Sequence, residues 1–178
     1  MKSICLHFIF HVIIAITSLG VIQAAPVLDV NNAIEQGFSL NAKMDLLVDV
    51  DGTLTLDQVM SSKNFELAGE KTPNFGFSSS VYWVRFSLLN STDQSLLLVE
   101  LGYTFLDYVS LFSPDSAGGF REKISGDMLP FSERARDHRT VTFELAQEPS
   151  TTATYYLRIQ TTSSVQIPLR VYTEASFG

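Results

Sequence analysis

Two segments of the sequence carry the same order of side chains, aromatic, aromatic, aliphatic and arginine, and they read YWVR and YYLR. Alternate residues of a strand share a face, so Trp83 lies beside Arg85 in the first segment and Tyr156 beside Arg158 in the second. Flat rings can stack on sugar rings, and the arginine fork holds hydroxyls or carboxylates at two points. The pattern predicts that these four side chains contribute to one concave ligand-binding face. The alternative is that each arginine pairs with an acidic residue on its own sheet while the aromatic ring packs.

A second candidate is the irregular stretch 125–139, the most basic segment of an acidic chain. Its basic side chains are Arg134, Arg136, His138 and Arg139. Loops of β-sandwiches often carry binding residues, so this segment is a candidate for contact with an anionic group. The alternative is a solvated connection that neutralises nearby acids. Arg134 and Tyr103, which lies in a predicted corner at 102–105, complete the candidate ligand-binding set.

Patterns for catalysis and metal binding are weak. Asp49 and Asp51 precede Gly52, but position twelve of a calcium loop that starts at Asp49 is Met60 instead of glutamate. An Asp-Gly turn is the better interpretation. His138 is the only histidine after residue 24, and the sequence has no Gly-x-Ser-x-Gly motif. We therefore expect no enzyme activity, no catalytic residue, no metal and no cofactor.

The net charge of the chain limits its possible binding partners, and its first residues indicate its cellular location. The 178 residues include 12 basic and 19 acidic side chains, which argues against nucleic acid and anionic membranes as main partners. Residues 1–24 are typical of a cleavable secretory signal peptide, with Lys2 before an apolar run and small residues near the cleavage point. We expect a leader at 25–44 and one folded domain at 45–177. Cys5 is the only cysteine, so this domain has no disulfide.

The elements that would position these residues are short strands. The clearest is 81–89, whose apolar face (Tyr82, Val84, Phe86 and Leu88) is predicted to face the core. A polar turn at 90–95 leads to a strand at 96–101, which we expect to pair with 81–89 as a hairpin. Further strands are expected at 46–50, 53–56, 65–71, 107–113, 120–124, 140–145, 154–161 and 165–172, with a short capped helix at 55–60. Pro168 predicts an edge position or a bulge in the last strand.

About eight or nine short strands with a turn roughly every ten residues predict an all-β fold, an antiparallel jelly-roll-like β-sandwich. The sequence also resembles a known family, the second type of extracellular sensor domain of bacterial seven-transmembrane receptors with diverse intracellular signalling modules. The resemblance rests on the order and spacing of six segments, at 49–59, 75–90, 99–112, 126–134, 155–159 and 167–171.

The resemblance implies a carbohydrate-binding-module-like fold and a periplasmic sensor that binds a carbohydrate or a related small molecule. It also implies a seven-transmembrane receptor partner, in the same chain or in a separate one. The sequence ends at Gly178, where the first membrane span of the family would soon begin. We expect either the sensor piece of an interrupted receptor or a stand-alone protein. The alternative function is a soluble carbohydrate-binding protein or a binding module separated from an enzyme.

Overall fold

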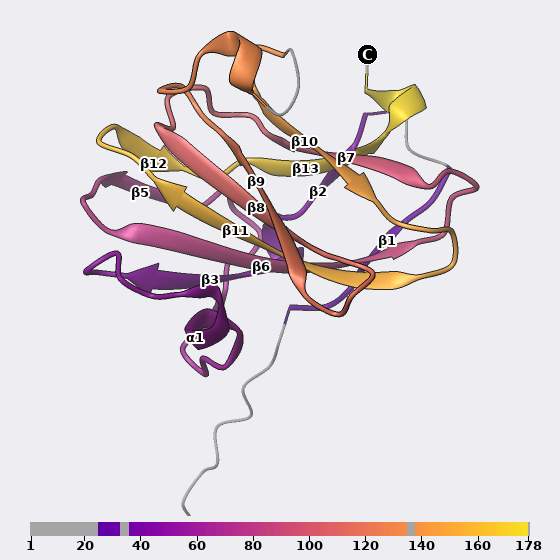
Figure 1. The fold of residues 1–178 in the computed structure, drawn as a ribbon, viewed down its shortest axis with the longest axis horizontal. Coiled ribbons are helices and arrows are strands. Elements are labelled where there is room, and N and C mark those ends of the chain that lie inside the picture. Colours follow the sequence, from indigo (N-terminus) through magenta and orange to yellow (C-terminus); the bar gives the residue numbers. More distant parts are fainter. Residues whose placement is uncertain (1–24, 33–35, 135–137, 178) are drawn as a thin grey trace, which may run out of the picture.

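The computed structural model describes residues 25–32, 36–134 and 138–177 as an all-β sandwich of two main sheets (Figure 1). The large sheet has the order β4 (Glu66–Leu67), β3 (Met44–Asp49), β6 (Val81–Asn90), β11 (Thr152–Gln160), β8 (Tyr108–Pro114) and β9 (Phe120–Ser125), with β1 (Leu28–Val30) parallel to β6. The second sheet has the order β10 (Val141–Ala146), β7 (Leu96–Leu101), β13 (Leu169–Thr173) and β2 (Phe38–Ser39). A two-stranded sheet joins β12 (Ser164–Gln166) to β5 (Asn74–Phe77). The predicted sandwich is therefore confirmed.

The main core lies between the large and the second sheet. The predicted inner face of β6, with Tyr82, Val84, Phe86 and Leu88, is buried there. Apolar residues of β7, β10 and β13 in the second sheet belong to the same cluster. Alternation along β6 thus identified the buried face correctly, because a strand exposes successive side chains to opposite sides.

The hairpin expected between 81–89 and 96–101 is wrong, because β6 and β7 lie in different sheets. β6 is flanked by β3 and β1 on one side and by β11 on the other, which leaves no edge for β7. The turn is fixed by Asn90, whose Nδ2 donates to the carbonyls of Gln94 and Gln147. Both strands have apolar inner faces, and the crossing between sheets lets those faces pack against each other.

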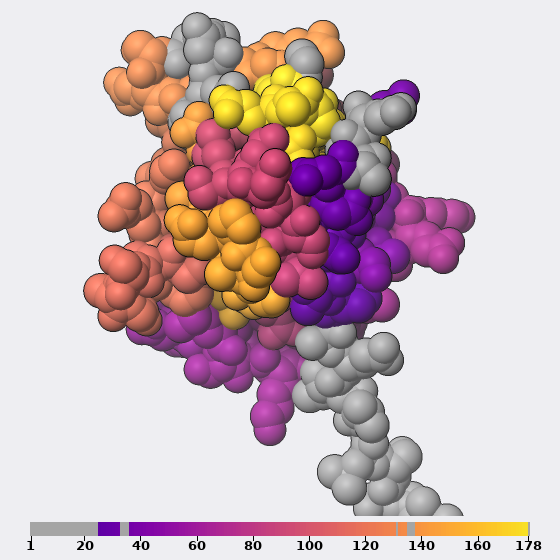
Figure 2. Space-filling view, turned by 90° about the vertical axis from the view of Figure 1, so that its right-hand side faces the viewer, coloured from indigo at the N-terminus to yellow at the C-terminus, as the bar shows by residue number. Residues whose placement is uncertain are grey.

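The segment 25–44, expected to be a leader, takes part in the sandwich. It supplies β1 and β2, and four of its apolar side chains are buried in the main core: Leu28, Val30, Leu40 and Met44. Figure 2 shows the N-terminal segment, in indigo, packed directly against the segment around residue 100. The folded unit therefore begins before residue 45. The predicted signal peptide at 1–24 lies outside the described residues.

The single strand expected at 165–172 is divided into β12 and β13. Ile167 donates its N–H to the Pro73 carbonyl, and the Pro168 carbonyl accepts from Gly102 N–H. Pro168 has no N–H to give to a ladder, so the break falls where the sequence placed an irregularity. The chain passes here from the two-stranded sheet into the second sheet.

The segment after β3 is a turn followed by the helix α1 (Leu56–Met60), so the strand expected at 53–56 is absent. Gly52 has φ +68°, and the two carboxylate oxygens of Asp49 accept from the N–H groups of Thr53 and Leu54. Thr55 and Gln58 form a capping box at the start of α1. The Asp-Gly turn was predicted, and the sequence predicted either Thr55 or Asp57 as the cap of a short helix here; the structure selects Thr55.

Three short 3-10 helices complete the described secondary structure: η1 (Asn41–Lys43), η2 (Phe131–Glu133) and η3 (Glu174–Ser176). Within the described ranges, no helix is long and apolar enough to cross a membrane.

If the segment 25–44 belongs to the core, Leu40→Ala will lower the free energy of unfolding by about 2–5 kcal/mol, because it leaves a cavity at a fully buried site. Val27→Ala, at an exposed position of the same segment, serves as the control and should stay within about 0.5 kcal/mol. Urea unfolding followed by tryptophan fluorescence measures both changes. An unchanged midpoint for Leu40→Ala would contradict this description of the core.

Candidate functional site

The register of the large sheet brings together the four side chains of the first sequence hypothesis. Tyr156 of β11 lies opposite Arg85 of β6, and Arg158 lies opposite Trp83. All four belong to the face of the sheet that points away from the main core. We call this face the outer face.

Trp83, however, is buried, with a relative exposure of 1%. It belongs to a second apolar cluster that also contains Val59 of α1 and Phe65. Its ring stacks on Phe112 at 5.6 Å. The segment 54–65, which we call the cover segment, closes this part of the outer face. In this structure the Trp83 ring therefore offers no open surface for stacking on a sugar.

Arg85 is held by an acidic residue of its own sheet. Its Nε and Nη2 donate to Asp45 Oδ2 at 3.0 and 2.7 Å, and its guanidinium lies 4.1 Å from the centre of the Phe65 ring. The exposed fraction of the Asp45 side chain is 2%. Arg85 therefore pairs with an acidic residue of its own sheet, as the alternative interpretation of the two arginine segments predicted.

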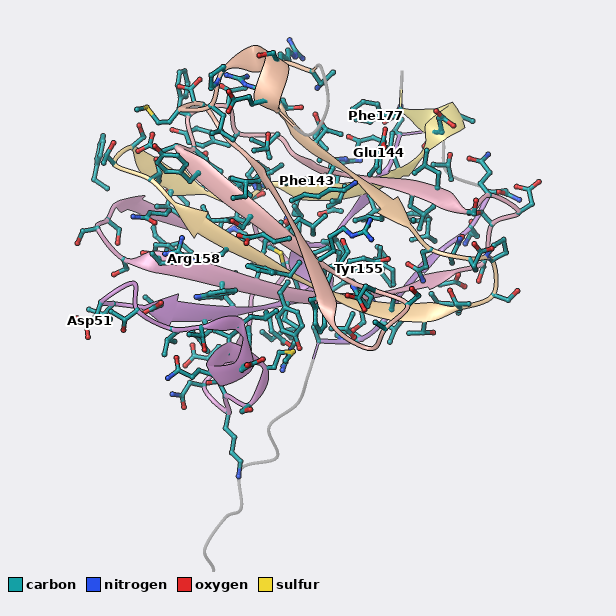
Figure 3. All side chains as sticks on the ribbon, viewed as in Figure 1. Asp51, Phe143, Glu144, Tyr155, Arg158 and Phe177 are labelled. Carbon is teal, nitrogen blue, oxygen red and sulfur yellow. The ribbon has the colours of Figure 1, made fainter. Side chains whose placement is uncertain are left out.

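Tyr156 and Arg158 lie next to this pair. Burial raises the pKa of Tyr156, and the positive charge of Arg85 opposes that shift. The Tyr156 ring meets Phe120 edge to face at 5.6 Å. Arg158 is half-buried and donates to Gln160 Oε1 at 3.0 Å and to the Gly52 carbonyl at 3.5 Å. In Figure 3, Arg158 lies on the sheet and Asp51 lies at the tip of the loop after β3.

The other predicted residues lie apart from this face. Arg134 contacts its own loop, through Asp127 at 3.5 Å and the Leu129 carbonyl at 3.4 Å. Tyr103 packs against the main core and meets Phe105 edge to face at 5.7 Å. Arg136 lies outside the described residues.

His138 and Arg139 line a cleft of about 250 Å³ beside the last residues of the chain. There Glu100 accepts hydrogen bonds from the hydroxyls of Thr140 and Tyr172, at 2.7 and 2.8 Å. Phe177 packs against the rings of His138 and Tyr172. Both carboxylate oxygens of Glu100 thus accept a hydrogen bond, and the cleft combines this negative charge with the basic side chains of His138 and Arg139.

A larger cleft lies at the end of the sandwich where β5 and β12 are found, on the left in Figure 1. Its volume is about 520 Å³, and it is lined by residues 77–79, 107–108 and 160–162. The first group comes from the end of β5 and the loop after it. The second comes from the start of β8 and the residue before it, and the third from the end of β11 and the loop after it. We call it the end cleft.

The end cleft combines exposed rings with polar groups. Phe77 is 85% exposed and Tyr108 is 42% exposed, so both rings offer apolar surface to a ligand. Asp107 Oδ2 accepts from the N–H and the hydroxyl of Thr162, at 2.7 and 2.8 Å. The rim therefore presents two rings, hydroxyls, an amide and a carboxylate in one concave site.

Sequence reasoning missed the end cleft. Phe77 lies within the segment 75–90 and Asp107 within the expected strand 107–113, and neither was predicted to bind a ligand. A useful signal was present: a phenylalanine followed by three serines, Ser78 to Ser80, has no neighbours in sequence that would bury its ring. The contacts with Asp107 and Thr162 depend on the fold and have no local signal.

A second groove, of about 420 Å³, lies between β4 and β5. It is lined by Val48, Leu67 and Phe75 among others, and the Phe75 ring stacks on Tyr82 at 4.3 Å.

Among the residues that the structure describes, no group of three or more His, Cys, Asp or Glu side chains is arranged to hold a metal ion.

Comparison with known proteins gives one family. The model of the family described as 7TMR-DISM extracellular 2 matches residues 41–173. Among solved structures, a GH31 alpha-xylosidase from Xanthomonas citri is similar at 12% identity and a TM-score of 0.36, over 77% of this chain and 16% of that enzyme. This likeness is too low to carry an argument. No curated protein matches the chain.

The contacts of Arg85 lead to a prediction about stability. Arg85→Ala will lower the free energy of unfolding by about 3–5 kcal/mol, because it leaves the buried Asp45 carboxylate without its cation. Arg158→Ala removes the same charge from a half-buried site and should cost about 1 kcal/mol or less. Thermal and urea unfolding of both variants measures the difference. Equal, small losses would show that the pair with Asp45 contributes little to the fold.

Proposed function

Because the chain belongs to the 7TMR-DISM extracellular 2 family, whose members are extracellular sensor domains of seven-transmembrane receptors, we propose that it senses a carbohydrate or a related small molecule in the periplasm. The sensor acts by binding and performs no chemistry on its ligand. Its partner is a seven-transmembrane receptor, either in the same chain or as a separate protein. Secretion through the predicted signal peptide at 1–24 would deliver it to the periplasm.

The end cleft is the single observation that carries the choice of ligand. Its volume of about 520 Å³ falls within the range of sites for small molecules. The exposed rings of Phe77 and Tyr108 supply flat apolar surfaces for the faces of sugar rings. Ser79, Thr162 and Gln160 are exposed beside them and supply hydrogen-bonding groups for sugar hydroxyls.

Five of the residues predicted from the sequence, Trp83, Arg85, Tyr103, Tyr156 and Arg158, take supporting roles in this proposal. Arg158 donates a hydrogen bond to the side-chain oxygen of Gln160, a residue of the cleft lining. Tyr103 supports Phe105, whose carbonyl accepts from the Thr161 hydroxyl at 3.1 Å. Trp83, Arg85 and Tyr156 stabilise the sheet from which β11 extends to the cleft.

A panel of neutral and amino disaccharides, tested by thermal shift and then by calorimetry, checks the proposal. A bound sugar at 100 times its Kd adds about 2.7 kcal/mol to the free energy of unfolding, which raises the Tm by several degrees. Phe77→Ala should weaken binding of any positive sugar about tenfold or more and leave the Tm of the free protein nearly unchanged, because the ring is exposed.

Leu67→Ala is the matched control, since it removes an exposed apolar side chain from the groove between β4 and β5. Loss of binding in Leu67→Ala with full binding in Phe77→Ala would move the ligand to that groove. If no sugar of the panel raises the Tm, the carbohydrate assignment is wrong.

A further inference from the structure

The lining of the end cleft carries negative charge only. Asp107 is the only residue of the cleft lining that is charged at neutral pH, because residues 77–79, 107–108 and 160–162 include no Lys, Arg or His. Arg158, which lies two residues before Gln160 on β11, donates to Gln160 and Gly52 and does not line the cleft. A ligand in this cleft therefore meets a carboxylate that no lining cation neutralises.

The carboxylate is also held in one orientation. Thr162 gives two short hydrogen bonds to Oδ2, one from its N–H and one from its hydroxyl. Among the described residues, no hydrogen bond reaches Oδ1, and Asp107 is only partly buried. One oxygen thus anchors the loop at 161–163, and the other remains able to accept a hydrogen bond from a ligand.

The two exposed rings favour the same kind of ligand group. The faces of Phe77 and Tyr108 carry negative potential, which attracts a cation placed over them. Without residues 1–24 the chain has 11 basic residues, the 12 of the full chain less Lys2, against 19 acidic ones. The field of the whole protein therefore attracts cations and repels anions.

We propose that the end cleft selects saccharides that carry a free ammonium group, with Asp107 accepting a charge-assisted hydrogen bond from that group. Neutral sugars of the same ring geometry bind less tightly, and sugar acids are rejected. This inference rests on the proposed function, because it names the ligand class of the same cleft.

The test compares three β-1,4-linked disaccharides that differ only at the second carbon of each ring: the free-amine disaccharide of chitosan, cellobiose and diacetylchitobiose. Calorimetry at low salt and neutral pH should give the free amine a Kd about tenfold lower than the other two. Asp107→Asn keeps an oxygen that can accept from Thr162 and removes the charge. In this variant the preference for the amine should fall to about twofold or less.

Asp93→Asn is the matched control, because it makes the same change of net charge in the exposed turn at the far end of β6. It should leave the preference intact. If it lowers the preference as much as Asp107→Asn does, the field of the whole protein makes the selection, and the role of Asp107 is overturned. Equal or tighter binding of cellobiose by the unmodified protein also overturns the inference, while the proposed function stands. If none of the three sugars binds, the inference fails, and the wider panel of disaccharides decides whether the proposed function stands.

Discussion

The burial of β6 on both faces is the constraint on which the rest of this structure depends. Its inner face packs against the second sheet, and its outer face is closed by the cover segment at Trp83. A strand buried on both sides must satisfy any charge it carries, because an unpaired ion in such a place costs several kcal/mol. The pair of Arg85 with Asp45 meets that requirement, and it fixes β3 beside β6 at the same time.

This constraint explains why binding is better assigned to an end of the sandwich than to its faces. The inner face forms the core, and the part of the outer face with the most aromatic surface is covered. The ends carry loops from strands that are distant in sequence, and their backbone is free to vary without loss of core packing. At the end with β5 and β12, the rings of Phe77 and Tyr108 are exposed beside Asp107.

Local features of this fold could be predicted from the sequence, and distant ones could not. The inner face of β6, the turn at Gly52 and the cap at Thr55 each depend on residues within a few positions of each other. The pairing of β6 depends on which strands reach it from elsewhere in the chain, so the expected hairpin with 96–101 was wrong. The same holds for the segment 25–44, whose apolar residues have no local period strong enough to show that they complete both sheets. The end cleft joins three segments that are more than 25 residues apart, and no short pattern contains it.

The covalent path from the end cleft suggests how a sensor of this shape can transmit binding. Thr162, which Asp107 anchors, is followed directly by β12, by the break at Pro168 and by β13. After β13, the chain enters η3, and Phe177 packs against Tyr172. β13 is paired on both sides, with β7 and β2, and these ladders hold it within the second sheet. A ligand that contacts Asp107 would therefore lie at the start of a covalent path that runs through β12, Pro168 and β13 to η3.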